Sequence, residues 1–204
     1  MNDDHAPNHP PLDPRADAVL QYWFGPRDSD QWGTMRSLWF AGGEAADTEI
    51  RTRFGALHGP ACAGELDGWT TSAEGSLALL LVLDQFSRNL HRGSARAFEA
   101  DAKAVAIANE AIARGFDQQV LPLQRWFFYL PFEHAEDLDA QRRAVALFSA
   151  LPDDADRQMG VDYAKRHLAV IERFGRFPHR NARLGRSSTA DEAQWLAEGG
   201  ENFG

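Results

Sequence analysis

The segment SLALLLVLDQFSRNLHR, residues 76–92, constrains the fold of this chain more than any other stretch. As a helix, its first half is apolar almost all the way round, because two separate stripes of side chains are hydrophobic. One stripe holds Leu77, Leu80 and Leu81, and the other holds Leu79, Val82, Leu83, Phe86 and Leu90. A helix of this kind needs packing partners on every side, so we predict that it is the buried centre of the molecule.

Helix signals recur along the rest of the chain, whereas the alternation typical of strands is hard to find. The expected helices cover about 14–24, 32–40, 47–57, 73–91, 95–114, 122–129, 136–150 and 154–174, with a short final helix after Thr189. A chain of 204 residues is long enough for one domain with a real core. The sequence therefore predicts an all-α fold of about nine helices in a single domain.

Capping residues set the expected helix boundaries. Thr71 with Glu74, and Thr189 with Glu192, form two possible capping boxes, and Pro131 is expected to interrupt the helix that starts at about residue 122. We expect a disordered tail over residues 1–12, one helical domain over 13–198 and a frayed end over 199–204. The tetratricopeptide consensus is not met, but the number of helices is compatible with stacked helix pairs.

The charge of the chain is unevenly distributed. The segment RFGRFPHRNARLGR, residues 173–186, carries five arginines and no acid, although the net charge of the whole chain is −9, so the remaining residues have a net charge of −14. This balance excludes general binding of nucleic acid or of an anionic membrane. The longest apolar run, Leu77 to Leu83, is too short to span a bilayer, and a single cysteine, Cys62, fits a cytoplasmic location.

Polar residues continue the apolar stripes of segment 76–92. Asp84 and Arg88 are spaced as an i,i+4 pair, with Gln85 and Asn89 beside them. One interpretation is an internal ion pair, because a buried charge needs a partner. The other is the floor of a polar pocket.

The segment YLPFEHAEDLDAQ, residues 129–141, concentrates acids around a histidine. Glu133 and His134 are candidates for acid–base chemistry, and together with Glu136 and Asp137 they are candidate metal ligands. No recognised metal-binding spacing is present, so we predict no metal site and favour an acidic cluster that neutralises arginines. We interpret His167 as a core residue, with proton transfer as the alternative, and Cys62 as a small packed side chain.

Arginines 173, 176, 180 and 183 have helical spacing, but Gly175, Pro178 and Gly185 favour a structured loop instead. Phe174 and Phe177 are expected to anchor this loop in the core. The loop would then direct some of its polar side chains inward, namely Arg176, His179, Arg180 and Asn181. These side chains can pair with the acids of segment 133–139 or bind an external anion.

Three motifs are similar to those of a bacterial family called domain of unknown function nine-two-four. They are LDQFSRNLHRGSARAFEADAKA, YLPFEHAEDLDAQ and FGRFPHRNARLGRSSTADEAQWL, and the early VLQYWFG also fits. The resemblance implies a tetratricopeptide-repeat-like helical fold and no established reaction. It also implies that the family's polar positions converge on one site: Asp84, Gln85, Arg88, Asn89, Arg92, Glu133, His134, Glu136, Arg176, His179, Arg180, Asn181 and Arg186.

Three functional hypotheses follow. In the first, the arginines and His179 bind a small anionic molecule or a peptide carboxylate, with no cofactor. In the second, the same pocket belongs to a metal-independent hydrolase or lyase, and Glu133 or His134 is the general base. In the third, the polar cluster is architectural and the protein acts through a protein–protein surface.

Overall fold

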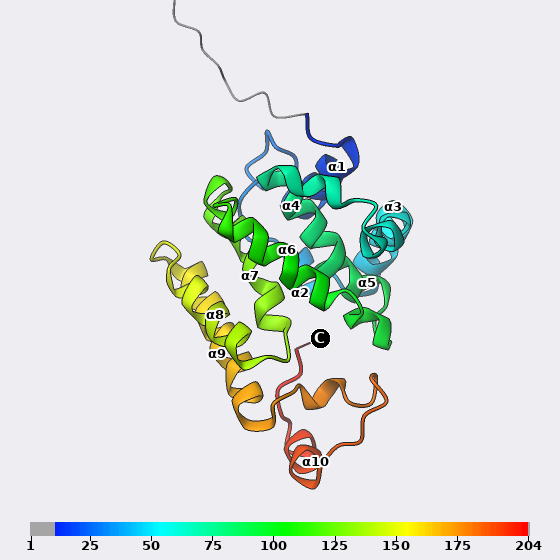
Figure 1. Cartoon of the computed structure of the whole chain (residues 1–204), viewed down its shortest axis with the longest axis vertical. Coiled ribbons are helices and arrows are strands. Elements are labelled where there is room, and N and C mark those ends of the chain that lie inside the picture. Colours follow the sequence, from blue (N-terminus) through cyan, green and yellow to red (C-terminus); the bar gives the residue numbers. More distant parts are fainter. Residues whose placement is uncertain (1–10, 204) are drawn as a thin grey trace, which may run out of the picture.

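The computed structural model describes residues 11–203, except for the side chains of Phe40, Ala41 and Ala155, and this part of the chain contains helices and turns but no strand (Figure 1). The helices are α1 (Pro14–Phe24), α2 (Leu38–Ala41), α3 (Gly43–Ala63), α4 (Ala73–Leu80), α5 (Ser87–Leu90), α6 (Asp101–Ala113), α7 (Pro122–His134), α8 (Leu138–Ser149), α9 (Ala155–Phe174) and α10 (Ala190–Ala197). The all-α class and the single domain are therefore confirmed.

The central helix is continuous from α4 to α5 through a π-helical turn, Leu81–Phe86. It packs against α1, α3, α6 and α7. Every side chain from Leu77 to Leu83 is at most 1% exposed, which confirms that this apolar segment is the centre of the core. The π-helical turn was not predicted, and it contains Asp84 and Gln85. Such turns insert one extra residue and are frequent at functional sites.

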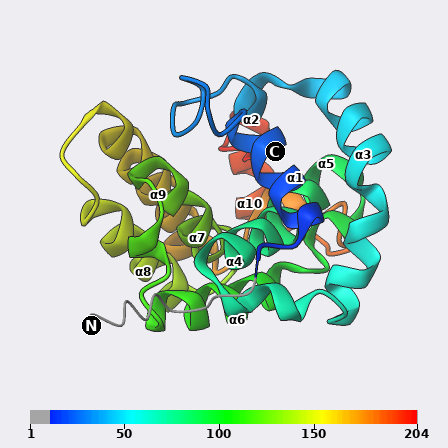
Figure 2. The ribbon, with the colours of Figure 1, turned by 90° about the horizontal axis from the view of Figure 1, so that it is seen from above.

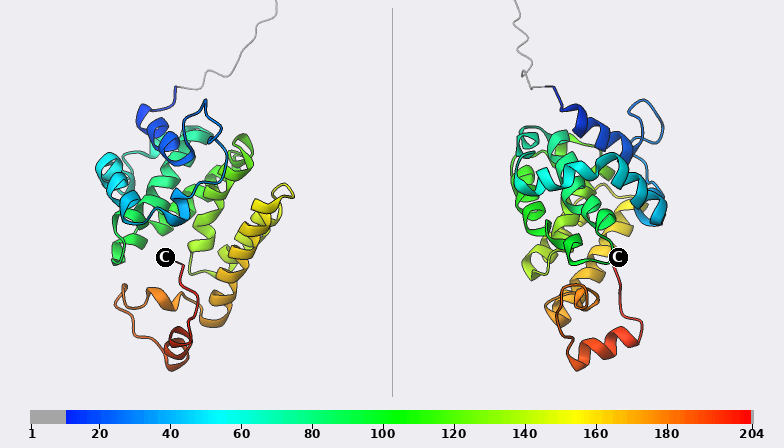
Figure 3. Two further views of the ribbon diagram at one scale, coloured as in Figure 1. Left: turned by 180° about the vertical axis from the view of Figure 1, so that it is seen from behind. Right: turned by 90° about the vertical axis from the view of Figure 1, so that its right-hand side faces the viewer.

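Helices α7, α8 and α9 pack side by side in chain order, and Figure 2 shows them on the opposite side of the molecule from α1, α3 and α5. Packing of sequential neighbours is compatible with the predicted stacking of helix pairs. Below this layer, α10 and the loop before it form a smaller lobe (Figure 3). Phe177 is fully buried there with Val170 and Ile171, and Phe174 is partly buried against Trp195, so both phenylalanines anchor the loop.

Two predicted features are wrong. The stretch expected to be helical over 32–40 is mostly turn, and only Leu38–Ala41 is helical. Gly33 explains this, because it has a φ of +83° and a Cβ at that position would lie 2.5 Å from Leu121 Cδ1. Pro131 does not interrupt α7, which continues to His134. A proline in a helix forfeits one hydrogen bond, and the burial of Pro131 among the aromatic side chains of α7 offsets that loss.

Several boundaries also differ from the prediction. Helix α3 runs six residues beyond the expected end at Leu57. The helix expected over 95–114 is split into a 3-10 turn, Ala95–Phe98, and α6. Ser72, not Thr71, caps α4, and its hydroxyl accepts from Gly75 N at 3.1 Å. The capping box of Thr189 and Glu192 is confirmed.

Residues 1–10 of the expected tail lie outside the described residues. At the other end, residues 201–203 run from α10 back toward α9 (Figure 3). Among the described residues, no helix is both long enough and apolar enough to span a bilayer.

Candidate functional site

Asp84 and His134 join the central helix to the end of α7. Asp84 is 2% exposed, and its Oδ1 lies 2.7 Å from His134 Nδ1 and 3.1 Å from Arg88 Nη1. The predicted Asp84–Arg88 pair is therefore confirmed. When Nδ1–H of His134 donates to Asp84, the lone pair of the ring is on Nε2. Asp84 thus fixes both the tautomer and the orientation of the imidazole.

Glu133 and His167 form a second buried pair, between α7 and α9. Glu133 Oε1 lies 3.0 Å from His167 Nδ1, which also lies 2.9 Å from the backbone oxygen of Tyr163. Gln141 holds the end of α7 in place, because its Nε2 donates to the backbone oxygens of Glu133 and Ala135. Glu133 Oε2 and His167 Nε2 are buried and have no hydrogen-bond partner among the described residues. A buried polar atom without a partner is unusual in a folded protein, and both residues line the cavity described below.

The environments of these groups set their protonation. Burial and the nearby carboxylate of Asp84 raise the pKa of Glu133 to about 8. Burial lowers the pKa of His167 to about 2, and burial and Arg88 lower the pKa of His134 against the opposing effect of Asp84. Burial alone would raise the pKa of Asp84, but Arg88 and His134 outweigh it and lower that pKa. At neutral pH the site therefore presents a protonated carboxyl and two neutral imidazoles.

Glu133, His134 and His167 line a cavity of about 560 Å³, a size typical of small-molecule sites. Helices α1, α2, α7, α8 and α9 and the C-terminal segment contribute to its wall. The apolar part of the lining consists of Trp23, Leu38, Trp39, Gly42, Gly43, Trp126, Phe127, Leu130, Phe148, Gly160, Tyr163 and Phe203. The polar part consists of Gln85, Arg88, Asn89, Arg92, Glu133, His134, Arg166, His167 and Asn202.

Each arginine of the lining is paired with an acid of the protein. Arg88 donates to both carboxylate oxygens of Asp101, at 3.1 and 3.2 Å. Arg166 pairs with Glu201. Arg92 binds Asp47 through Nε at 2.6 Å and Nη2 at 2.9 Å, and its Nη1 has no partner among the described residues. Arg92 is about half exposed, so it keeps one donor toward a ligand.

The structure brings together seven of the thirteen predicted site residues. Six line the cavity, namely Gln85, Arg88, Asn89, Arg92, Glu133 and His134, and Asp84 lies against His134 and Arg88. The other predicted residues do not line it and lie around the loop of residues 173–186, hereafter the arginine loop: Glu136, Arg176, His179, Arg180, Asn181 and Arg186.

Ion pairs within the protein hold the arginine loop in place. Arg186 binds Glu136 through both terminal nitrogens, at 2.5 and 2.8 Å, as expected for a loop that pairs with segment 133–139. Arg176 instead binds Glu192 of the α10 capping box, at 2.7 and 2.8 Å. Asn181 also donates to Glu192 and accepts from Arg186 Nε. Glu192 therefore connects α10 to the loop and was recognised in the sequence only as a cap.

Arg180 is the most buried cation of the arginine loop. Its guanidinium lies 4.6 Å from the ring centre of Phe98 and 4.4 Å from that of Phe177, and Nη1 lies 3.4 Å from Asp101 Oδ2. Burial and Arg88 lower the pKa of Arg180 to about 10. Because Asp101 also binds Arg88, it links the arginine loop to the cavity.

Sequence reasoning missed Asp101, Asp47 and the apolar wall, and it favoured a core position for His167, with proton transfer as the alternative. None of these residues carries a local motif, because their roles depend on partners far away in the chain. The segment YLPFEH holds one signal that could have located Glu133 and His134. If the helix continues through Pro131, these two residues lie in its last turn, as the structure shows. Three residues elsewhere, His58, Cys62 and Glu99, form a group that can hold a metal ion.

Comparisons with known proteins agree with this architecture. The family model described as a bacterial protein of unknown function (DUF924) matches residues 19–200. A solved structure of a protein of unknown function from Agrobacterium tumefaciens is 43% identical and superposes with a TM-score of 0.78, covering 90% of this chain and 97% of that one. No curated protein matches the chain.

Proposed function

The chain belongs to the DUF924 family of bacterial proteins of unknown function, and from its cavity we propose that the protein binds a small anionic molecule with an apolar body. The observation that carries this proposal is that one cavity is lined both by large aromatic side chains and by polar and charged ones. Such a lining favours a ligand that has both an apolar and a polar part.

The aromatic wall favours a planar or branched apolar group. Trp39, Trp126 and Phe127 line the cavity from α2 and α7. Large aromatic side chains contribute strongly to binding when a ligand covers them. An apolar body in contact with these rings supplies most of the affinity, and the polar side chains of the lining set the orientation of the ligand.

The polar side chains of the lining favour a ligand with a carboxylate or phosphate of modest charge. Glu133 is protonated at neutral pH, so Oε2–H is a donor without a partner among the described residues. Arg92 offers Nη1 as a second donor, whereas Asp84 and Asp101 neutralise Arg88. A ligand anion therefore accepts hydrogen bonds from a carboxyl group and one arginine, rather than from the full set of arginines that the sequence suggested.

A matched pair of probes tests this proposal. Isothermal titration calorimetry at pH 7 compares 3-phenylpropionate with its neutral amide. We expect the carboxylate to bind at least tenfold more tightly, and Arg92→Gln to abolish the difference, because a hydrogen bond to a charged group is worth about 1.5–3 kcal/mol. Arg173→Gln is the control, because Arg173 pairs with Asp191 away from the cavity. Equal binding of acid and amide, or equal losses in both variants, would contradict the anionic ligand.

A second candidate function is acid–base catalysis in the same cavity. The observation that favours it is the Asp84–His134 pair beside a carboxyl whose pKa is raised to about 8. His134 Nε2 removes a proton from water or from the substrate, and Glu133 donates a proton to the leaving group. The described lining includes no serine, threonine or cysteine, so this proposal uses water rather than a side chain as nucleophile.

Turnover assays with small esters, amides and hydroxy acids test the catalytic proposal. We expect His134→Ala to lower kcat by at least a hundredfold, the lower end of the usual contribution of general acid–base catalysis. His179→Ala is the control, because His179 does not line the cavity. Equal activity of the two variants would remove His134 from the mechanism.

The third hypothesis, a purely architectural cluster, has support in one region. Arg176, Arg180 and Arg186 bind acids of the protein and do not line the cavity. We therefore assign a structural role to these three side chains. The protein–protein surface of the third hypothesis remains a prediction from the sequence.

A further inference from the structure

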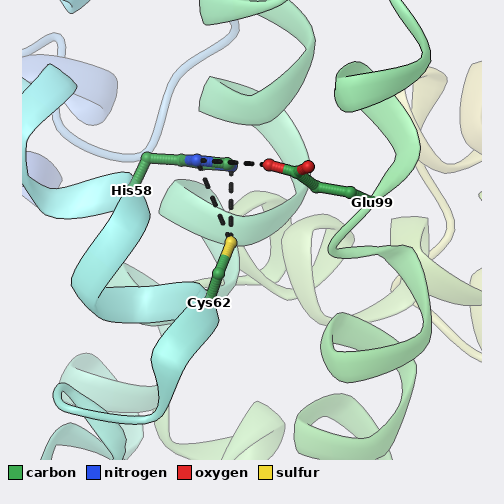
Figure 4. Close-up of side chains that lie close together, drawn as sticks. All are labelled: His58, Cys62 and Glu99. Atoms are coloured by element: carbon green, nitrogen blue, oxygen red, sulfur yellow. Dashed lines mark hydrogen bonds and ion pairs between the residues drawn. The ribbon is translucent and has the colours of Figure 1, made fainter.

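His58, Cys62 and Glu99 lie close together at the end of α3, outside the residues that line the cavity (Figure 4). His58 and Cys62 are four residues apart on one face of α3. Glu99 comes from the turn between Ala95–Phe98 and α6. Figure 4 shows that the three side chains point toward one another, and one ligand atom of each lies within 4.8 Å of the others.

The separations approach those of a first coordination shell. His58 Nδ1 lies 3.9 Å from Cys62 Sγ and 4.0 Å from Glu99 Oε1. Bond lengths of about 2.0–2.3 Å to a tetrahedral metal place neighbouring ligand atoms about 3.3–3.8 Å apart. The ligand atoms of the group lie within 4.8 Å of one another, so their separations exceed this range by up to about 1 Å. Binding therefore requires rotation of Cys62, which is partly buried, and of Glu99, which is 41% exposed.

A buried hydroxyl orients the imidazole. Ser87 is fully buried, and its Oγ lies 2.5 Å from His58 Nε2. When Nε2–H donates to Ser87, the lone pair of the ring is on Nδ1, which lies 4.0 Å from Glu99 Oε1. Cys62 Sγ lies 3.9 Å from Nδ1 and 3.7 Å from Nε2, below the ring in Figure 4, so its side chain has to rotate toward Glu99 to share an ion with Nδ1. A hydrogen bond from the distal ring nitrogen is a regular feature of metal-binding histidines, because it sets the tautomer and the ring orientation.

The surroundings leave room for a metal and for a fourth ligand. Cys62 is only partly buried and Glu99 is exposed, so an ion can enter from solvent. The ring of His91 lies 4.9 Å from that of His58, and its buried Nε2 has no partner among the described residues. Arg96 lies 3.6 Å from Glu99 and opposes a cation, but its side chain is 62% exposed and can turn into solvent.

We propose that His58, Cys62 and Glu99 bind a divalent transition metal of the zinc type. His58 binds through Nδ1, Glu99 through its carboxylate, and Cys62 as a thiolate whose proton passes to solvent. A thiolate, an imidazole and a carboxylate together favour Zn²⁺ or Co²⁺ over Mg²⁺ or Ca²⁺, which prefer oxygen alone. Three protein ligands leave a fourth position for water or for His91.

Titration of the full chain with Co²⁺ tests the site directly, because a cobalt–thiolate bond has a charge-transfer band in the near ultraviolet. The background chain carries His5→Gln and His9→Gln, which remove the histidines of the N-terminal tail. We expect a band that saturates at one Co²⁺ per chain and disappears when excess Zn²⁺ is added.

Matched variants separate the proposed ligands from their neighbours. Cys62→Ser should abolish the band, and Glu99→Gln should weaken Co²⁺ binding at least tenfold. Glu65→Gln changes an exposed acid just after α3 that is not part of the group, so this variant should bind Co²⁺ as the background chain does. His58→Gln also removes a ligand, but His58 is 2% exposed, so this substitution can disturb folding. The Glu99 side chain is 41% exposed, so Glu99→Gln tests metal binding without that effect. The absence of the band, or equal affinity in Glu99→Gln and Glu65→Gln, would overturn the proposal.

Discussion

The imidazole of His134 and the carboxylate of Asp84 lie 2.7 Å apart, although fifty positions separate them in the chain. Their contact joins the π-helical turn of the central helix to the last turn of α7. The extra residue of the π-helical turn and the passage of α7 through Pro131 each determine where one of the two side chains lies. The contact between Asp84 and His134 therefore depends on two irregular features of the backbone.

Asp84→Asn should destabilise the protein strongly. The substitution keeps the shape of the buried side chain but leaves the partly buried guanidinium of Arg88 with only Asp101 as an anionic partner. Breaking a buried ion pair costs about 3–5 kcal/mol, and we expect the lower end because Asp101 remains. Urea denaturation at pH 7 measures the free energy of unfolding. Asp153→Asn, at an exposed pair with Arg157, should change it by less than about 1 kcal/mol.

Glu133 should make the protein less stable as the pH rises toward 8. Its pKa is about 8 in the folded chain and 4.5 ordinarily, so between these values the unfolded state is ionised and the folded state holds the proton. The stabilisation is complete below pH 4.5 and is lost as the pH rises through 8. From pH 7 to 8 the expected loss is about 1 kcal/mol, because one pKa unit corresponds to about 1.4 kcal/mol.

Comparison of wild type with Glu133→Gln isolates this effect. Histidines with lowered pKa values change stability mainly below pH 6.5, so denaturation curves at pH 7, 7.5, 8 and 9 avoid them. We expect a falling stability in wild type and a nearly flat one in Glu133→Gln. Parallel curves for the two proteins would show that Glu133 is already ionised at pH 7.

Arg180→Ala should cost about 3 kcal/mol, whereas Arg173→Ala should cost less than about 1 kcal/mol. Arg180 is buried between two phenylalanine rings and pairs with Asp101, and Arg173 is half exposed and pairs with Asp191. Thermal and urea denaturation of both variants measure the difference. Similar losses in the two would mean that the Arg180 pair is as weak as a surface pair.

Phe203→Ala should expose His167. The two rings are stacked with their centres 3.6 Å apart, and His167 is 3% exposed. Removal of the phenyl ring opens one wall of the cavity, so diethyl pyrocarbonate should modify His167 several times faster than in wild type. Peptide mass spectrometry follows the modification of each histidine separately. His91, far from Phe203 in the chain and outside the cavity lining, is the internal reference.

Much of the fold was predictable because helix formation depends on local sequence patterns. The apolar segment from Leu77 to Leu83 required a central position, and the Thr189 capping box and Gly175 marked helix ends correctly. Prediction failed where long-range packing overrides local preference. Pro131 is buried within α7, which continues past it. Gly33 has a positive φ and leaves no room for a Cβ beside Leu121, and the chain forms a turn there in place of the expected helix.

The candidate site was predictable only in part. Charges at i,i+4 spacing identified Asp84 and Arg88, and the clustering of acids around a histidine identified Glu133 and His134. The H-x-x-x-C spacing of His58 and Cys62 was overlooked because the expected helix ended at Leu57, and both residues then lay outside it. Asp101 carries no local signal, since its two arginine partners are 13 and 79 positions away.

By itself, the sequence determined the all-helical class and the buried central helix, and it reduced the partners of the arginine loop to internal acids or an external anion. These properties follow from periodicity, capping and the cost of burying charge, all of which are local or general. Only the tertiary structure decided which acid each arginine binds and which polar groups face the cavity. Ion pairing is specific in space but not in sequence, so Arg176 binds Glu192 and Arg186 binds Glu136 because the fold brings α10 and the end of α7 to the same loop.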